Sequence, residues 1–116
     1  MSASLPENPG ELMSYQAREN ATYYYKGNME GADVHFYFNV ETKTFLCETE
    51  VMGKTAKMAG DLEFDDSTLT AKCTPVWGVQ PFGDNDDWVS TAGEEVKTFV
   101  LGSDTVDFEG CTLTKQ

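Results

Sequence analysis

The sequence predicts an all-β, single-domain protein of about seven to nine short antiparallel strands, built as a β-sandwich or a small β-barrel. Short runs rich in aromatic and β-branched residues follow one another along the chain. Turn signals separate these runs about every 8–12 residues, and the 3.6-residue period of an amphipathic helix is absent after the first twenty residues. The length of 116 residues fits one domain with its own core.

Alternation of apolar and polar residues is the evidence for each strand. It is strict at residues 33–40, where Val34, Phe36 and Phe38 share one face. Gly53-Lys54 suits a tight hairpin. The other strands are expected at residues 21–26, 44–52, 55–59, 61–64, 68–73, 88–91, 95–101 and 105–114, with the last two paired across a turn at 102–104.

Residues 1–20 are predicted to form an N-terminal arm outside the all-β domain of residues 21–116. The arm is rich in Pro, Gly, Asn and Ser, and it suits at most two helical turns at residues 11–18. Its spaced apolar residues would anchor it on its own domain or on a neighbouring subunit. These residues are Leu5, Leu12, Met13 and Tyr15.

The chain is strongly acidic, and the acidity is concentrated in its second half. Twenty Asp and Glu residues against eight Lys and Arg residues give a formal net charge of −12. Twelve of the acids and three of the bases lie in residues 61–116. This field repels phosphate backbones, so direct nucleic-acid binding is not expected. A basic protein partner, divalent cations or simple solubility in a salty medium are the alternatives that remain.

The sequence also bears on the compartment of the protein. No stretch approaches the roughly 18 apolar residues of a membrane span, so no membrane partner is expected. The first twenty residues lack a basic region followed by an apolar run, so we expect no signal peptide and an intracellular or cytoplasmic protein. A mature secreted form is the alternative.

The three cysteines, Cys47, Cys73 and Cys111, are expected to be buried free thiols. They contain no CxxC motif, and their number is odd, so neither a zinc site nor a disulfide framework is predicted. One disulfide and one free thiol is the alternative for an oxidising compartment.

The candidate binding site is the connection at residues 74–88, which contains the stretch WGVQPFGDNDDWV. Long loops in compact β domains often carry function, and aromatic residues are enriched in interface cores. The alternatives are that the two tryptophans plug an open barrel end, or that the acids hold calcium. Calcium needs about six to eight oxygens, which the run does not supply in the known order, so no metal is expected. The candidate partner- or ligand-binding residues are Trp77, Phe82, Trp88, Asp84, Asp86 and Asp87.

No residue pattern argues for catalysis or for a cofactor. The one histidine, His35, lies in the middle of a strand, and neither a nucleophile motif nor a nucleotide loop is present. We therefore expect a non-enzymatic protein–protein interaction or assembly module that acts through the loop at 75–88 and the arm, as an accessory structural protein or an acidic inhibitor would. The alternative is a barrel that binds a small molecule or glycan, and a small-barrel enzyme ranks last. The expected cavity lining is Tyr24, Phe36, Phe38, Phe45, Phe99 and Phe108.

Overall fold

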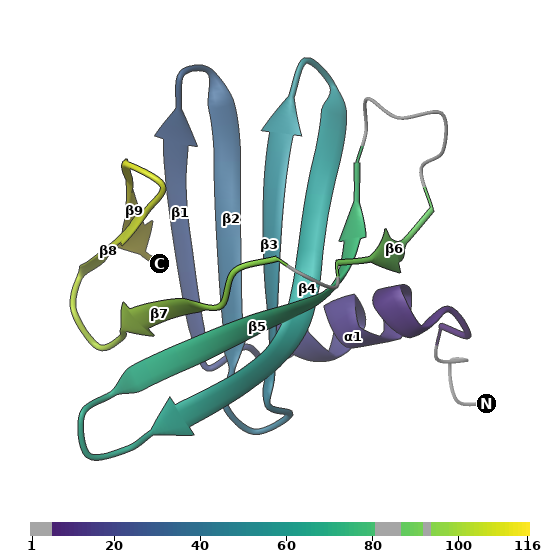
Figure 1. The fold of residues 1–116 in the computed structure, drawn as a ribbon. Coiled ribbons are helices and arrows are strands. Elements are labelled where there is room, and N and C mark those ends of the chain that lie inside the picture. The colour runs from purple at the N-terminus through teal and green to yellow at the C-terminus, as the bar shows by residue number, and fades with distance from the viewer. Residues whose placement is uncertain (1–5, 81–86, 92–93) are drawn as a thin grey trace.

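The computed structural model describes residues 6–80, 87–91 and 94–116, which form one helix and nine strands (Figure 1). All strand pairs are antiparallel, so the predicted all-β class is confirmed. The elements are α1 (Pro9–Arg18), β1 (Tyr23–Met29), β2 (Ala32–Asn39), β3 (Thr44–Val51), β4 (Lys54–Asp65), β5 (Thr70–Val79), β6 (Val89–Ser90), β7 (Lys97–Val100), β8 (Thr105–Phe108) and β9 (Cys111–Lys115).

The strands form a single open sheet that curls over on itself. Its order is β6-β5-β4-β3-β2-β1-β9-β8, and β7 pairs with the same edge of β5 as β6. In Figure 1, β5 and β7 pass in front of the upright strands β1–β4. No strand ladder joins β7 to β8 in the described part of the chain, so the curled sheet does not close there into a barrel.

Aromatic side chains fill the concave face of the sheet. The Phe36 ring stacks on Phe38 and Phe45, with centroids 4.5 and 5.8 Å apart. Phe99 and Phe108 meet it edge-on at 5.1 and 5.4 Å. These rings are all buried, as are Val34 and Leu62 beside them. The predicted face of residues 34, 36 and 38 is therefore confirmed as core.

The two strands predicted at residues 55–59 and 61–64 are one strand, β4, with a β-bulge at Ala59/Gly60. β4 runs without a break from Lys54 to Asp65, and its partner β5 extends to Val79. The prediction of a loop beginning at residue 74 is therefore wrong for residues 74–79. Pro75 misled it, because proline inside a strand is confined mostly to edges and bulges, and Pro75 lies opposite Gly60 at this bulge.

The pairing predicted near the C-terminus is also wrong. β7 pairs with β5 instead of with residues 105–114. Those residues are two strands, because Glu109 and Gly110 both have positive φ, 49° and 82°, and turn the chain between β8 and β9. β9 then pairs with β1, which places the C-terminal hairpin at the opposite end of the sheet from β6.

Residues 9–18 form a docked helix, which is longer than the at most two helical turns expected at residues 11–18 of an otherwise extended arm. The Asn8 side chain caps α1 by accepting hydrogen bonds from the Gly10 and Glu11 amides, at 2.8 and 3.2 Å, and Pro9 occupies the first turn. At the other end, the Asn39 amide donates to the Gln16 and Glu19 carbonyls. No helix in the described part of the chain is long and apolar enough to cross a membrane.

Small residues let α1 lie close to the convex face of the sheet, where it contacts β2, β3, β4 and β5. Its buried positions are Gly10, Ser14 and Ala17, spaced by four and three residues along one side of the helix. This side is not an apolar stripe, and for that reason the helical period gave only a weak signal in the sequence.

Candidate interaction surface

Trp77 and Trp88 pack under α1 on the convex face, away from the concave interior. Trp88 is buried, with 8% of its surface exposed, in a cluster with Ala17, Leu46, Ala59 and Val79. Its indole Nε1 donates to Glu11 Oε1 at 2.6 Å. Trp77 is half-buried against the same cluster. Trp88 thus contacts the chain's own helix and Trp77 packs against the same cluster, so the two tryptophans are neither a plug in the concave interior nor a fully exposed lip.

The other candidate residues give less information. Phe82, Asp84 and Asp86 lie outside the described residues, and Asp87 is exposed directly before Trp88. The calcium alternative depends on the same undescribed run. Within residues 6–80, 87–91 and 94–116, no group of three or more His, Cys, Asp or Glu residues could hold a metal ion.

The aromatic residues expected to line a ligand cavity pack against one another instead. Phe36, Phe38 and Phe99 have centroids 4.5 to 5.5 Å apart, which is direct ring contact. Tyr24 is not on this face at all. It lies on the convex side, where it stacks on Tyr37 at 4.6 Å and its hydroxyl hydrogen-bonds to His35 Nδ1 at 2.7 Å.

The cysteines are free and buried, as predicted. Burial raises the pKa of the Cys47 thiol from 9.0 to about 12, and it raises the pKa of Cys73 as well. A protonated thiol is a poor nucleophile. Cys47 lies opposite Phe36 on the concave face, whereas His35 belongs to the convex face, so these two residues do not form a nucleophile–base pair.

Beyond the bulge, the outward side of β4, β5 and β7 is uncovered (Figure 1). Strand register places side chains of different character in three neighbouring rows, which we call the outward face. Glu63 pairs with Lys72, and Lys72 pairs with Thr98. The outward face consists of Asp61, Glu63 and Asp65 on β4, Thr70, Lys72 and Thr74 on β5, and Val96, Thr98 and Val100 along β7.

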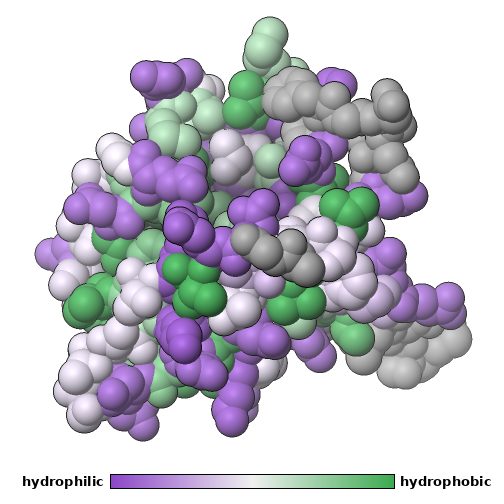
Figure 2. All heavy atoms as spheres, viewed as in Figure 1, coloured by the Kyte–Doolittle hydropathy of each residue, from purple (hydrophilic) through white to green (hydrophobic). Residues whose placement is uncertain are grey.

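Exposed aliphatic residues gather at the edge of this face. Among the described residues, six large hydrophobic side chains are exposed, and three of them, Leu69, Val96 and Val100, lie on or beside β7. Val89 belongs to the opposite face, because it pairs with Gly78 farther along β5. Val100 is 59% exposed and Val96 is 45% exposed. The view in Figure 2 shows hydrophobic residues set among hydrophilic ones, so this side of the molecule is mixed in character.

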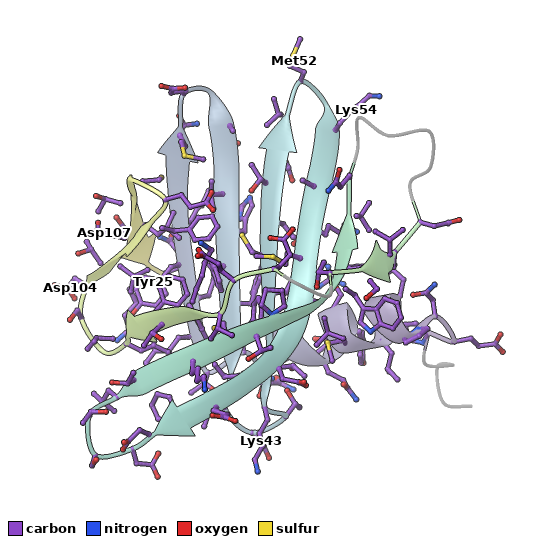
Figure 3. The ribbon with its side chains drawn as sticks, viewed as in Figure 1. Tyr25, Lys43, Met52, Lys54, Asp104 and Asp107 are labelled. Carbon is purple, nitrogen blue, oxygen red and sulfur yellow. The ribbon has the colours of Figure 1, made fainter. Side chains whose placement is uncertain are left out.

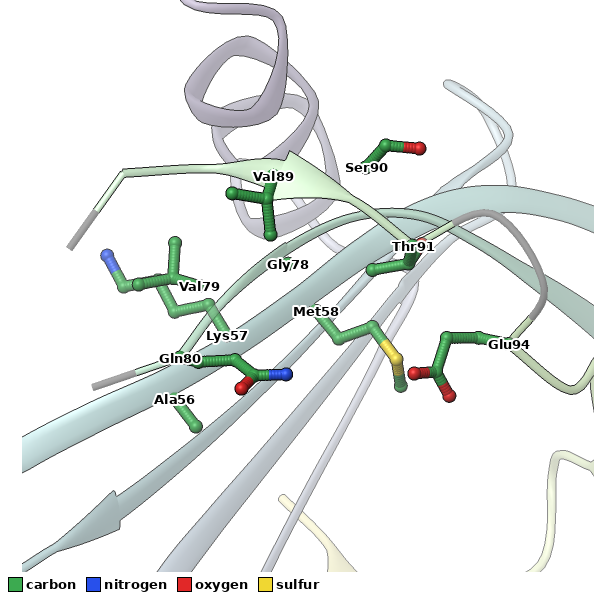
Figure 4. A pocket seen from close by; sticks show the side chains of 10 residues that line it. All are labelled: Ala56, Lys57, Met58, Gly78, Val79, Gln80, Val89, Ser90, Thr91 and Glu94. Carbon is green, nitrogen blue, oxygen red and sulfur yellow. The ribbon is translucent and has the colours of Figure 1, made fainter. Parts of the chain in front are cut away.

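Two hollows flank these strands. One, of about 440 Å³, lies beside β6 and is lined by parts of β4 and β5, by residues 89–91 and by Glu94 (Figure 4). Among the residues that the structure describes, none hydrogen-bonds to the buried Thr91 hydroxyl at this hollow. The other hollow, of about 720 Å³, lies at the β4–β5 hairpin and includes Glu63, Asp65 and Lys72.

Sequence reasoning missed the outward face for a physical reason. In the sequence, residues 61 and 63 alternate with apolar residues as on the solvent-exposed face of any strand, and residues 95–101 indicate an ordinary strand. Only the registers of β4 and β7 on β5 place the valine row and the carboxylate row on the same face, with one strand between them. Comparisons with known proteins offer no further guide, because no family model, curated protein or solved structure matches the chain.

Proposed function

We propose that the protein is a non-enzymatic protein-interaction module that binds its partner through the β7 edge of the sheet. The observation that carries this proposal is the presence of exposed aliphatic side chains on and beside β7, at Leu69, Val96 and Val100. Exposed apolar groups that cluster on a protein surface mark contact sites, whereas scattered ones do not.

The backbone at this edge supports the same function. β7 pairs with β5 on one side, and no strand pairs with its other side within the described residues. This open edge leaves the exposed side chains of β7 accessible to a partner. Native proteins usually protect such an edge with charges, but the exposed side chains of β7 include Val100, and Val96 lies directly before it.

The interior supports a role at the surface. Its aromatic rings are in mutual contact, so the concave face serves as core and offers little room for a ligand. The three thiols are buried, burial raises the pKa of Cys47 and of Cys73, and the histidine lies on the opposite face from Cys47. The described residues thus supply no arrangement of nucleophile and base.

Paired variants test the proposal. Val96→Ser with Val100→Ser makes the edge polar, while Met52→Ser alters a turn residue that is 90% exposed at the far end of the β3–β4 hairpin (Figure 3). The tagged full chain would be crosslinked to its neighbours in its native cells, and the recovered proteins would be quantified for each form. We expect at least one protein that the wild type and Met52→Ser recover equally and that the edge variant recovers about fivefold less.

That protein would then be purified and its affinity for each form measured. Equal affinity for the edge variant and the wild type would contradict the proposal. Light scattering on the pure chain detects self-association, which would make a second copy the partner, provided that the edge variant abolishes it. A monomer whose recovered proteins do not depend on Val96 and Val100 would also count against the proposal.

A further inference from the structure

We propose that the outward face of β4, β5 and β7 binds a basic amphipathic helix of the partner protein. This inference rests on the proposed function and names the chemistry of the partner segment. The occupant would carry Lys and Arg along one flank and aliphatic residues along the other. It would lie with the basic flank on Asp61 and Glu63 and with the aliphatic flank on Val96 and Val100.

The spacing of the rows fits a helix. The carboxylate row on β4 and the valine row on β7 are separated by two strand spacings, about 9.6 Å. A helix with its side chains is about 10 Å wide, so one helix covers both rows. From residue 61 to residue 65 the strand extends about 13 Å, which is two to three helical turns.

An added strand fits the face less well. It would extend the sheet beyond β7, and its outward side chains would lie about 14 Å from the carboxylate row on β4. Its two faces also alternate, so basic and aliphatic residues would point to opposite sides of the sheet. A helix instead presents two chemically different flanks toward the same surface.

The charge of the face selects a basic partner. Lys72 is the one cation in the three rows, and its Nζ lies 4.0 Å from Glu63 Oε2, with both side chains exposed to solvent. Three carboxylates against one lysine leave the rows net negative. The Ser67 hydroxyl and amide donate to Asp65 Oδ1 at 2.6 and 2.9 Å. These hydrogen bonds, the one from the hydroxyl most of all, hold the pKa of this carboxyl below its ordinary value. Asp65 is therefore anionic at neutral pH.

The shape of the face also suits long cationic side chains. The hollow of about 720 Å³ at the hairpin is lined by Glu63, Asp65 and Lys72, together with Thr70 and the turn residues. A lysine or arginine of the partner can bury its methylene chain in this hollow and place its charged group near these carboxylates. Val100 is the register partner of Thr70, so the apolar contact lies directly beside the hollow.

A synthetic helical peptide with lysines on one side and leucines on the other, acetylated and amidated, is the probe. Amide shifts of the isotope-labelled full chain would report its binding. We expect shifts on β4, β5 and β7, with a dissociation constant on the order of 100 μM. Raising the salt from about 50 to about 300 mM should weaken binding about fivefold, because exposed charge pairs are screened. A peptide with glutamates in place of lysines should not bind.

Matched charge variants separate this face from the net charge of the molecule. Asp61→Lys with Glu63→Lys should weaken binding of the lysine–leucine peptide about tenfold. Glu30→Lys with Glu50→Lys, in the β1–β2 turn and near the end of β3, makes the same change in net charge at exposed positions away from the outward face and should leave affinity within about twofold. Val96→Ser with Val100→Ser should weaken binding about fivefold.

Several outcomes would overturn this inference: absence of binding at about 1 mM peptide, equal losses in the two charge variants, or shifts confined to other surfaces. The cell experiment above keeps the two proposals apart. If the valine variant loses its natural partner while the peptide fails to bind the outward face, the edge is an interaction site but its partner is not a basic helix. If neither the partner nor the peptide depends on Val96 and Val100, the proposed function fails as well.

Discussion

Gly10 and Trp88 form a close contact between α1 and the sheet. A Cβ atom at Gly10 would lie 2.4 Å from Cγ of the Trp88 ring, so only glycine lets the helix backbone rest on the indole. Glycine inside a helix costs about 1 kcal/mol relative to alanine. The contact offsets that cost by burying the ring and bringing Nε1 to Glu11.

We expect Gly10→Ala to destabilise the protein by about 1–3 kcal/mol, although alanine is the better helix former. Urea denaturation followed by far-UV circular dichroism measures the change. Trp88→Leu provides the control, because a smaller side chain leaves room for the new methyl group. The double variant should therefore cost less than the sum of the two single variants. Stabilisation by Gly10→Ala would show that α1 does not rest on Trp88 in solution.

At the level of elements, the bulge at Ala59/Gly60 determines how β4 and β5 run together. A Cβ atom at Gly60 would lie 2.1 Å from the Thr74 carbonyl oxygen and 2.7 Å from Phe45 Cε1. The position is therefore closed on one side by backbone and on the other by a core ring. The register shift here lets both strands bend so that the hairpin half swings in front of β1–β4 (Figure 1).

Gly60→Ala should cost about 2–4 kcal/mol, because the Thr74 backbone cannot yield as a flexible side chain would. Chemical denaturation again gives the value. Gly53→Ala is the matched control. Its φ of +78° strains any side chain, but no atom lies within 4 Å of the new Cβ, so we expect only about 1 kcal/mol. A cost for Gly60→Ala no larger than for Gly53→Ala would contradict the steric explanation.

The same elements show which parts of the fold can be predicted from local sequence. β2 alternates strictly, so its faces follow from the pattern alone, whereas in β3 Leu46 breaks the alternation because it is buried on the convex face beside α1. The course of β5 cannot be predicted in this way, because Pro75 indicates the end of a strand unless the bulge opposite it is known. The partner of β7 depends on a contact with β5 more than twenty residues away, and a turn signal at 102–104 cannot select it.

Considering the whole molecule, the all-β class follows from composition and turn spacing, whereas the location of the candidate surface does not. Acidity and aromatic content indicated a surface that binds a protein, and they directed attention to Trp77 and Trp88. Those side chains pack within the molecule, because residues 9–18 form a helix whose small residues leave room for the Trp88 indole. The importance of Val96 and Val100 is clear only from the strand registers, which place them, exposed, on the same face as the carboxylates of β4.

Stability at alkaline pH is a property of the whole molecule, because it reports several buried groups together. Burial raises the pKa of the Cys47 thiol from 9.0 to about 12 and the pKa of Tyr37 from 10.0 to about 12. The pKa values of Tyr25 and Cys73 are raised for the same first reason. In each case the folded state holds its proton more tightly than the unfolded chain. The corresponding stability is complete below about pH 9 and is lost as the pH rises toward 12.

The free energy of unfolding should therefore fall above about pH 9, by up to about 1.4 kcal/mol per pH unit for each such group. Urea midpoints between about pH 7 and 11 measure this fall. Cys47→Ala removes one thiol that ionises in the unfolded chain near pH 9 and in the folded chain only near pH 12. Although the variant loses stability at neutral pH, its curve should decline less steeply between these limits. Parallel curves for wild type and variant would mean that Cys47 ionises equally in both states, and that the concave core admits water.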